Sequence, residues 1–365
     1  LPTADNGAPQ QYTKGEQMRN RRLYCVLLIV AMLFVPGGLI ATGAAEEERE
    51  VVNVYSHRHY DADRALYEAF TAETGIEVRV VEAGADELIQ RLEAEGEQTE
   101  ADLLITVDAA RLTRAKSMGL LQSVDSKVLN DRIPAKLRDG EGMWYALTKR
   151  ARIIAYHKER SETSILSTYE ALADDAFSDT VAIRSSSNVY NQSLLASIVA
   201  HHGETAAREW AAGVVENMAR DPQGNDRDQL RAIAAGVADY AVVNTYYIGL
   251  MVNSTDPQQR QVGDQIGVFF PNQEGRGTHV NVSGGGVTRH ATNRDNAIRL
   301  LEFLVSDEAQ EKFAQANYEY PVVDGVTLAP TIAAWGDFRE DSLDLSLLGE
   351  YNDAAIRIFD EVSWQ

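Results

Sequence analysis

Apolar runs separated by polar turns predict that strands and helices alternate along the first part of this chain. Each short apolar run is followed by a stretch in which large apolar residues recur at helical spacing. The predicted strands are residues 51–55, 76–81 and 101–106, and the predicted helices are residues 63–74, 85–96 and 109–118. This βαβαβ order is typical of a parallel sheet with helices on both faces, so we expect an α/β fold.

A long strand-like segment, residues 144–156, separates this first unit from a second one. Lys149, Arg150 and Arg152 lie in its middle, and we interpret the segment as a crossing between two lobes. The second unit alternates again. Its predicted strands are residues 181–184, 240–243, 266–270 and 280–287, and its predicted helices are a segment capped by residues 185–187 that runs to 203, followed by residues 205–219, 228–235 and 294–305. A helical tail closes the chain.

The first 45 residues read as a leader. A basic stretch that starts at Met18 precedes an apolar stretch at residues 23–40, and small residues then precede an acidic run. This order is typical of a secretory signal peptide; a membrane anchor is the alternative, and Arg21-Arg22 leaves twin-arginine export open. We interpret the residues before Met18 as a remnant of cloning or an upstream misread start.

Composition and charge narrow the partners and the chemistry. The net charge of −21 argues against nucleic acid and anionic lipid as partners. Cys25, the only cysteine of the sequence, lies in the leader, so the mature chain has no thiolate and a metal would need oxygen or imidazole nitrogen. Neither a Gly-x-Ser-x-Gly nor a His-Glu-x-x-His motif occurs, which favours a binding protein over an enzyme.

Two adjacent tyrosines, Tyr246 and Tyr247, mark the candidate site. They follow a predicted strand, and Asn244 and Thr245 before them are natural helix caps. Neighbours on a helix differ by about 100°, so two phenols in a first helical turn can reach one small ligand. Ligands of α/β proteins bind at this edge of the sheet.

Three other residues stand at similar strand-to-helix junctions: His59, Tyr60 and Tyr190. One interpretation is that these tyrosines stack on a sugar or another organic ligand, since the sequence contains 15 tyrosines. The other is that their phenols bind a hard cation such as Fe(III), which drives phenols to deprotonate. Four phenolates exceed the charge of a trivalent ion by one, and Arg150 is the candidate to compensate. A surface or salt-bridged arginine is the alternative for Arg150. His201, His202, His279 and His290 are interpreted as solvated.

The chain resembles the periplasmic ferric-iron-binding proteins of ABC transporters, most closely the cyanobacterial-type FutA and IdiA group. The resemblance covers residues 51 to about 320. The segments that carry it are Tyr55-Ser-His-Arg-His-Tyr60, residues 101–108, 144–152, 184–193 and 217–224, and Asn244-Thr-Tyr-Tyr247. His57 departs from the family motif, which commonly has a serine there.

This resemblance implies a fold, a site and a role. It implies a type II periplasmic-binding-protein fold in which each of two lobes is a mostly parallel sheet flanked by helices, with Fe(III) in the cleft between them. It assigns residues 49–148 and 279–318 to the first lobe, and residues 149–278 and 319–365 to the second. The implied ligands are Tyr60, Tyr190, Tyr246 and Tyr247, with His59 beside them and Arg150 nearby.

The same resemblance implies what surrounds the site. In some relatives an anion or a water completes the shell around the iron, and the sequence leaves open which applies here. We expect a monomer in the periplasm that captures ferric iron and delivers it to the membrane subunits of an ABC permease. The alternative is an exported binding protein for an organic or anionic solute, such as a polyamine, thiamine or a phosphonate.

Overall fold

The computed structural model describes residues 50–365, which lie within one compact unit. The predicted signal peptide, with its Arg21-Arg22 pair, lies outside the described residues. Among residues 50–365, no helix has the length and apolar character needed to span a bilayer.

The strands and helices follow the predicted alternation closely. The strands are β1 (Val51–Ser56), β2 (Glu77–Glu82), β3 (Leu103–Thr106), β4 (Tyr145–His157), β5 (Val181–Ala182), β6 (Tyr240–Asn244), β7 (Ile266–Phe269) and β8 (Val280–Val287). The helices are α1 (Asp61–Thr74), α2 (Ala85–Glu95), α3 (Ala109–Ser117), α4 (Lys127–Arg132), α5 (Val189–Glu216), α6 (Asp226–Ala234), α7 (Thr245–Val252), α8 (Pro257–Asp264), α9 (Arg294–Leu304), α10 (Asp307–Ala316), α11 (Pro330–Ala333), α12 (Ser346–Glu350) and α13 (Asn352–Glu361).

Within residues 50–365 the strands form an eight-stranded sheet in the order β2-β1-β3-β8-β4-β6-β5, with β7 also paired to β4. β1 pairs in parallel with β2 and β3, and β5 pairs in parallel with β6, as the βαβ pattern predicts. The prediction of mostly parallel sheets fails at the centre, where β8 pairs antiparallel with β3 and β4, and β4 pairs antiparallel with β6 and β7. β4 and β8 run in opposite directions through the middle of the sheet, so the pairs at its centre are antiparallel.

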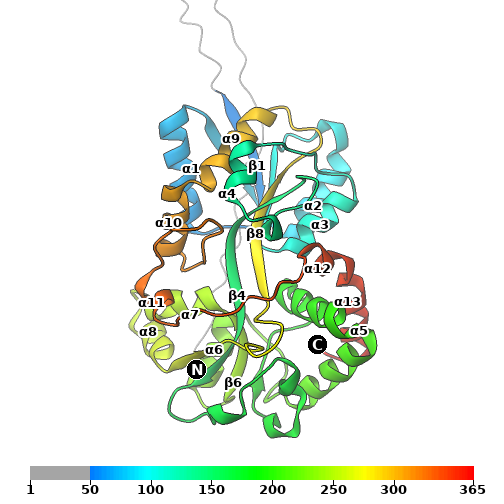
Figure 1. The fold of residues 1–365 in the computed structure, drawn as a ribbon, viewed down its shortest axis with the longest axis vertical. Helices are drawn as coiled ribbons and strands as arrows, with labels where there is room; N and C mark the ends of the chain where they lie inside the picture. The colour runs from blue at the N-terminus through cyan, green and yellow to red at the C-terminus, as the bar shows by residue number, and fades with distance from the viewer. Residues whose placement is uncertain (1–49) are drawn as a thin grey trace, which may run out of the picture. The chain divides into compact units, whose positions relative to one another are not determined.

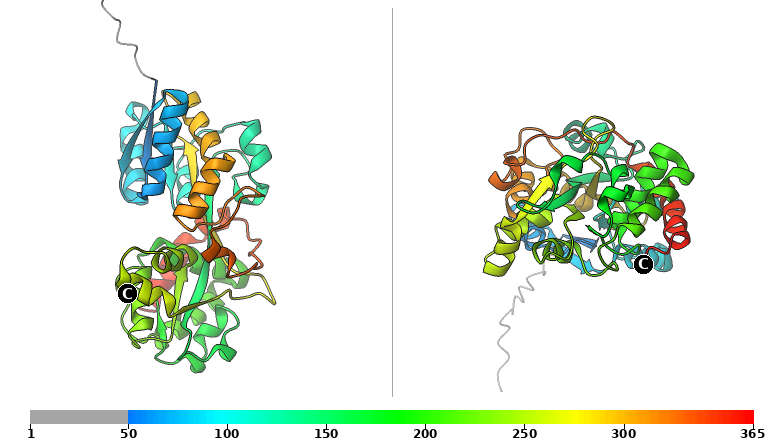
Figure 2. Two further views of the ribbon diagram at one scale, coloured as in Figure 1. Left: turned by 90° about the vertical axis from the view of Figure 1, so that its left-hand side faces the viewer. Right: turned by 90° about the horizontal axis from the view of Figure 1, so that it is seen from below.

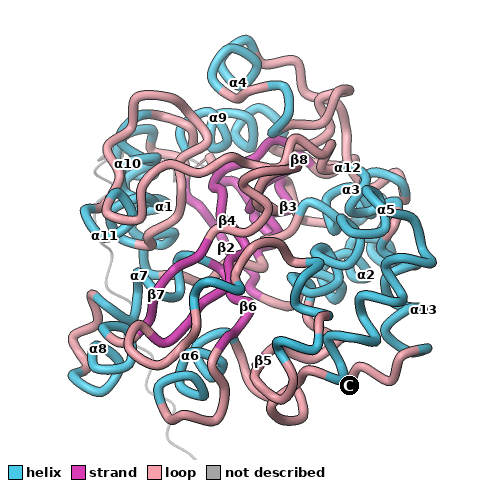
Figure 3. The backbone as a smooth tube through the Cα atoms, turned by 60° about the horizontal axis from the view of Figure 1, so that its bottom comes forward, coloured by secondary structure: helices cyan, strands magenta, loops and turns pink. Residues whose placement is uncertain are grey.

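β4 and β8 run side by side through the middle of the described unit (Figure 1). Helices flank the strands in the other views as well (Figure 2, Figure 3). The sequence predicts β4 as a crossing between two lobes. The apolar cluster to which its buried side chains belong changes along its length. Its first residues, through Leu147, belong to one apolar cluster, and residues from Ala151 onward belong to others. Between them lie Thr148 and Arg150, both buried and polar.

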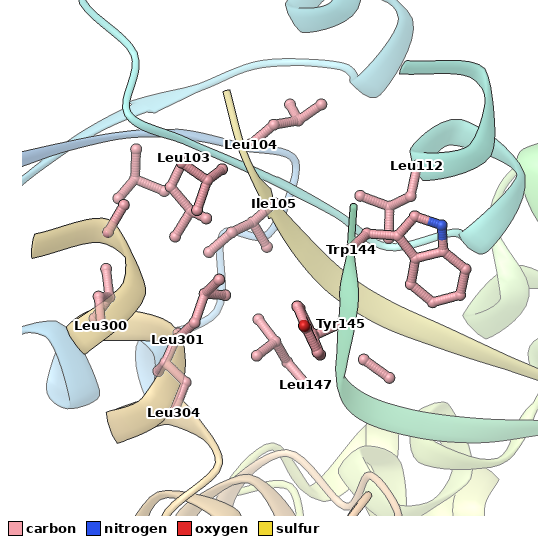
Figure 4. Packing of buried hydrophobic residues seen from close by; sticks show 14 of the residues in the cluster. Leu103, Leu104, Ile105, Leu112, Trp144, Tyr145, Leu147, Leu300, Leu301 and Leu304 are labelled. Carbon is pink, nitrogen blue, oxygen red and sulfur yellow. The ribbon is translucent and has the colours of Figure 1, made fainter. Parts of the chain in front are cut away.

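The first apolar cluster packs β3, the start of β4 and α9 together. Figure 4 shows Leu103 and Ile105 of β3 facing Leu301 of α9, with Tyr145 and Leu147 of β4 beside them. Each of these side chains is at most 1 % exposed, so removing any of them from water contributes about 1.5–3 kcal/mol for a side chain of leucine size. This packing fixes the start of β4, the strand that carries Arg150 further along.

The helix after β5 differs in detail from its prediction. It begins at Val189 rather than directly after residues 185–187, with Asn188 as the extended N-cap residue. Gly203 interrupts it with φ 79 and ψ 166, a left-handed backbone that glycine tolerates, so the predicted break at this position is present although α5 continues to Glu216. β5 ends at Ala182, two residues before the predicted end.

Candidate metal centre

Tyr246 and Tyr247 lie in the first turn of α7, directly after β6. Asn244 ends the strand and is the N-cap residue, with an extended backbone at φ −83 and ψ 142. The two rings lie 4.2 Å apart between centroids at an angle of 32°. Tyr246 is 2 % exposed. The predicted strand-to-helix junction therefore forms, and it turns both phenols toward the interior of the unit.

The hydroxyl groups of three tyrosines from distant parts of the chain meet at this junction. The Tyr60 hydroxyl donates to the Tyr246 hydroxyl at 3.2 Å, and the Tyr190 and Tyr246 hydroxyls also lie 3.2 Å apart. Tyr60 is the N-cap residue of α1, and Tyr190 lies in the first turn of α5. Together with Tyr247, the structure brings all four sequence-predicted tyrosines into one group, here named the tyrosine cluster.

Burial and mutual repulsion disfavour the ionised phenols. Burial raises the pKa of Tyr60, Tyr246 and Tyr247 well above the usual value of 10, and the neighbouring phenols raise these pKa values further. Without a cation, these phenols are therefore neutral at pH 7. A metal ion at this position would reverse that preference, since its charge outweighs every other local charge.

Arg150 lies beside the cluster and is buried, so the alternative of a surface arginine is wrong. Its Nη1 donates to the Ser283 hydroxyl at 3.0 Å, and its guanidinium lies 5.4 Å from the ring centre of Tyr190. Among the described residues, its Nε and Nη2 atoms have no hydrogen-bond partner. A buried cation with free donors next to four phenols can compensate negative charge that develops on them.

His59 stands apart from the hydroxyl contacts. Its ring stacks on the Tyr60 ring with centroids 5.2 Å apart, but the residue is exposed and its Nδ1 lies 3.4 Å from the His57 carbonyl oxygen. His57 is partly buried, and burial lowers its pKa to about 4. The structure thus places the His59 imidazole against the Tyr60 ring, at the solvent side.

The interpretation of His279 as a solvated loop residue is wrong. This side chain is 3 % exposed, and burial lowers its pKa to about 3. It lines a small cavity together with Arg150, Arg152 and Tyr190. His279 lies one residue before β8, and the approach of that strand to β4 carries it inside. His201 and His202 instead pair with Asp341 and Glu170 at 2.9 and 3.0 Å.

Sequence reasoning missed a second buried arginine that organises the cluster. Arg152 donates to Asp226 at 2.7 Å and to Asn191 at 2.8 Å, and Asp226 accepts the backbone N–H of Asn244 at 2.8 Å. Asn191 follows Tyr190, and Asn244 caps the helix of Tyr246. The sequence signal was available: Arg152 is a charged residue inside an apolar strand, which requires a buried partner. We name Arg152, Asn191, Asp226 and Asn244 the Arg152 network.

The donors at this place restrict the metals that fit. Over residues 50–365, no group of three or more His, Cys, Asp or Glu side chains is arranged to hold a metal ion. Zinc sites usually need His, Cys or carboxylate, and calcium sites need carboxylates and carbonyl oxygens. Four phenols with a compensating arginine instead suit a hard cation of high charge, which binds anionic oxygen.

Comparisons with known proteins identify the family of this chain. Residues 65–340 match the family described as bacterial extracellular solute-binding protein. The chain is 50 % identical over 318 residues to iron uptake protein A1 of Synechocystis sp., covering 87 % of this chain and 88 % of that protein.

Solved structures give the same picture. One is FutA (IdiA) from Trichodesmium in complex with iron and citrate ligands, with a TM-score of 0.83, 48 % identity and coverage of 86 % of this chain and 100 % of that one. A second is the ferric binding protein from Campylobacter jejuni, with a TM-score of 0.84, 45 % identity and the same coverage of both chains.

Proposed function

We propose that this chain, which belongs to the family of bacterial extracellular solute-binding proteins, captures Fe(III) through its tyrosine cluster and delivers it to an ABC permease for iron uptake. Tyr60, Tyr190, Tyr246 and Tyr247 would bind the ion as phenolates. Arg150 would offset the surplus negative charge. The resemblance expected from the sequence is confirmed, and the alternative of an organic or anionic solute is not favoured.

One observation carries this proposal: phenol hydroxyls from three separate elements meet at 3.2 Å. Phenols held this close repel one another when ionised, and burial together with this repulsion raises the pKa values of Tyr60, Tyr246 and Tyr247. Such an arrangement is costly for a protein that stacks on a sugar, because stacking uses ring faces and leaves the hydroxyls free to point elsewhere. It is favourable for one that surrounds a trivalent ion.

The shell around the iron has room for further donors. Four phenolates leave two positions of an octahedral ion open, and we propose that an anion or water fills them. His59 is a protein alternative, since its ring lies against Tyr60, but its side chain is exposed.

Capture and release would use closure of two lobes. We propose residues 49–148 with 279–318 as one lobe, and residues 149–278 with 319–365 as the other. The first apolar cluster draws mainly on the former set, and the clusters around α5 and β6 draw on the latter. The final segment packs in both proposed lobes. Leu345 and Leu348 belong to the first apolar cluster, and Ile358 and Phe359 belong to the cluster around α5. Iron contacting both lobes would select the closed form.

We propose a periplasmic monomer that the membrane subunits of the permease recognise. Export would depend on the signal peptide, whose residues precede the described part of the chain. The match to a family of extracellular solute-binding proteins supports a function outside the cytoplasm.

Isothermal calorimetry tests the proposed cargo. Ferric iron, supplied as a weak chelate to prevent hydrolysis, is titrated into the protein, and spermidine, thiamine and 2-aminoethylphosphonate are titrated under the same conditions. We expect one site per chain for iron and no heat of binding for the other three solutes. Binding of one of those solutes at a single site, with no binding of iron, would contradict the proposal.

A further inference from the structure

A buried arginine lies two residues before Tyr60 in the loop that follows β1. The Arg58 side chain is 1 % exposed, although an isolated buried charge is strongly unfavourable. Its guanidinium forms ion pairs with Asp63 and Glu319, each at 2.9 Å. Both carboxylates are themselves buried, so the three charges exist only as a set.

The same guanidinium reaches both central strands. Its Nη1 donates to the Ser283 hydroxyl of β8 at 2.7 Å and to the Thr148 hydroxyl of β4 at 3.2 Å. Glu319 also accepts from the Thr148 hydroxyl at 2.8 Å. We name Arg58, Asp63, Thr148, Ser283 and Glu319 the Arg58 network. It joins the loop after β1 to β4, β8 and the segment that follows α10.

The Arg58 network holds Tyr60 from two directions. The guanidinium carbon lies 5.3 Å from the ring centre of Tyr60, close enough for a cation–π contact. Asp63, which accepts from the Arg58 Nε at 2.9 Å, also accepts the backbone N–H of Tyr60 at 3.2 Å. The ring and the backbone of Tyr60 are therefore both set by partners of one guanidinium.

The Arg58 network also links Tyr60 to Tyr190, on the other side of the tyrosine cluster. Ser283 accepts from both Arg58 and Arg150, and Arg150 lies against the ring of Tyr190. A continuous path of contacts thus runs from Tyr60 through the two central strands to Tyr190. The geometry requires a residue with several donors in a fixed plane at the Arg58 position, which arginine provides and lysine does not.

We propose that Arg58 is a positioning residue that holds Tyr60 toward Tyr246 and couples this tyrosine to the central strands β4 and β8. This inference rests on the proposed binding of Fe(III), and it adds a residue that does not touch the metal. Loss of the Arg58 contacts acts on iron affinity through Tyr60 and leaves the contribution of the other tyrosines in place.

A double-mutant cycle tests this coupling. Arg58→Lys keeps the positive charge between Asp63 and Glu319 but loses the planar set of donors, so the protein remains folded while the ring of Tyr60 is released. Fe(III) affinity is measured by competition with a chelator in Arg58→Lys, Tyr60→Phe, Tyr247→Phe and the two double variants. Arg79→Lys, an exposed arginine of β2 paired with Glu77, is the matched control.

We expect Arg58→Lys to weaken iron binding by about 10–100-fold, as loss of a partner that orients a metal ligand does. In the Tyr60→Phe background the same change alters affinity by less than about twofold, whereas in the Tyr247→Phe background the full effect persists. Glu319→Gln, which leaves Arg58 in place, shows the same dependence on Tyr60. Arg79→Lys leaves the affinity unchanged.

Two results overturn the inference. One is an Arg58→Lys variant with the affinity of the natural protein. The other is a full Arg58→Lys effect that persists without the Tyr60 hydroxyl, which would mean that Arg58 acts through the fold. If Arg58→Lys fails to fold by circular dichroism, the cycle with Glu319→Gln decides by the same criterion. Failure of the unmodified protein to bind Fe(III) instead refutes the proposed function and is recognised before any variant is compared.

Discussion

Two buried arginines hold the two sides of the tyrosine cluster, and they differ in what they connect. Within the described part of the chain, the side-chain hydrogen-bond partners of Arg152 come from residues 149–278: Asn191, Asp226 and Asn244. The partners of Arg58 come from α1, both central strands and the segment after α10. One network is confined to one region of the chain, and the other spans several.

This difference assigns different roles to the tyrosines. The Arg152 network and two helix starts in the same region position three of the tyrosines, Tyr190, Tyr246 and Tyr247. We therefore expect these three to keep their arrangement whether or not the rest of the site is assembled. Tyr60 is set by contacts that depend on how β4, β8 and Glu319 lie together. We therefore expect Tyr60 to be the phenol whose position changes when the two proposed lobes open.

The largest effect on Fe(III) affinity is expected from Tyr246, whose hydroxyl lies close to those of both Tyr60 and Tyr190. Tyr246→Phe removes the hydroxyl that lies 3.2 Å from those of Tyr60 and Tyr190. We expect Fe(III) affinity to fall by more than the roughly 100-fold at the upper end of changes outside the ligand shell. Competition titration against a chelator measures it, with Tyr351→Phe on the surface as control. Equal affinities for the two variants would remove Tyr246 from the site.

A second prediction separates the two networks. Asp226→Asn weakens the anchor of Arg152 and of the Asn244 backbone, and breaking such a buried pair costs about 3–5 kcal/mol of stability. Because three tyrosines depend on this network, Asp226→Asn is expected to reduce iron affinity more than Glu319→Gln, which affects Tyr60 alone. Urea unfolding and chelator competition give both quantities. The reverse order of affinities would contradict the comparison.

A third prediction concerns pH. Burial and neighbouring phenols raise the pKa of Tyr60, Tyr246 and Tyr247, so in the free protein these groups carry their protons at neutral pH. Each phenol that binds iron as a phenolate then releases one proton, and the Fe(III) affinity must fall as the pH falls, by about tenfold per unit for each proton released. Chelator competition between pH 6 and 8 measures the slope. An affinity independent of pH would show that neutral donors hold the iron.

A fourth prediction concerns the stability of the free protein in acid. Burial lowers the pKa of His279 to about 3, below the unfolded value of about 6.5. The unfolded chain therefore binds this proton first, so the contribution is present above about pH 6.5 and is lost as the pH falls toward 3. We expect His279→Gln to lose less stability than the natural protein between pH 7 and 4. A steeper loss in the variant would contradict this assignment.

The smallest effect is expected from His59. Its side chain is exposed and makes no hydrogen bond to a tyrosine hydroxyl within residues 50–365, so His59→Ala is expected to change iron affinity by less than about twofold, as for other surface substitutions. The same titration measures it. A loss comparable to that of Tyr246→Phe would place the imidazole on the metal and require the loop after β1 to rearrange.

Much of the fold follows from local patterns. The type II periplasmic-binding-protein fold is confirmed by neighbours with TM-scores above 0.8 at 45–48 % identity. Apolar spacing and cap residues located β6 and the start of α7 to within a residue, because strand periods and helix caps are local properties. The antiparallel pairing of β4 and β8 was missed, since it depends on where distant segments meet.

In the candidate site, too, local sequence patterns predict some of the residues and the fold determines the others. The four tyrosines were found because each stands at a junction that the pattern reveals. The roles of Arg58, Asp226 and Glu319 were missed because pairing of buried charges is set by the fold, with partners up to 261 residues apart. His279 was misread for the same reason. A residue next to a glycine-rich strand gives no local sign of whether it ends up inside.

The absorption spectrum of the iron-loaded protein tests the central claim most directly. Phenolate bound to Fe(III) produces a visible charge-transfer band, so the protein with one equivalent of ferric iron is expected to be coloured, and the band should weaken and shift in Tyr246→Phe. Ferrous iron under anaerobic conditions should give no such band. A colourless protein that nevertheless holds stoichiometric ferric iron would contradict the account, since the ion would then be bound by other groups.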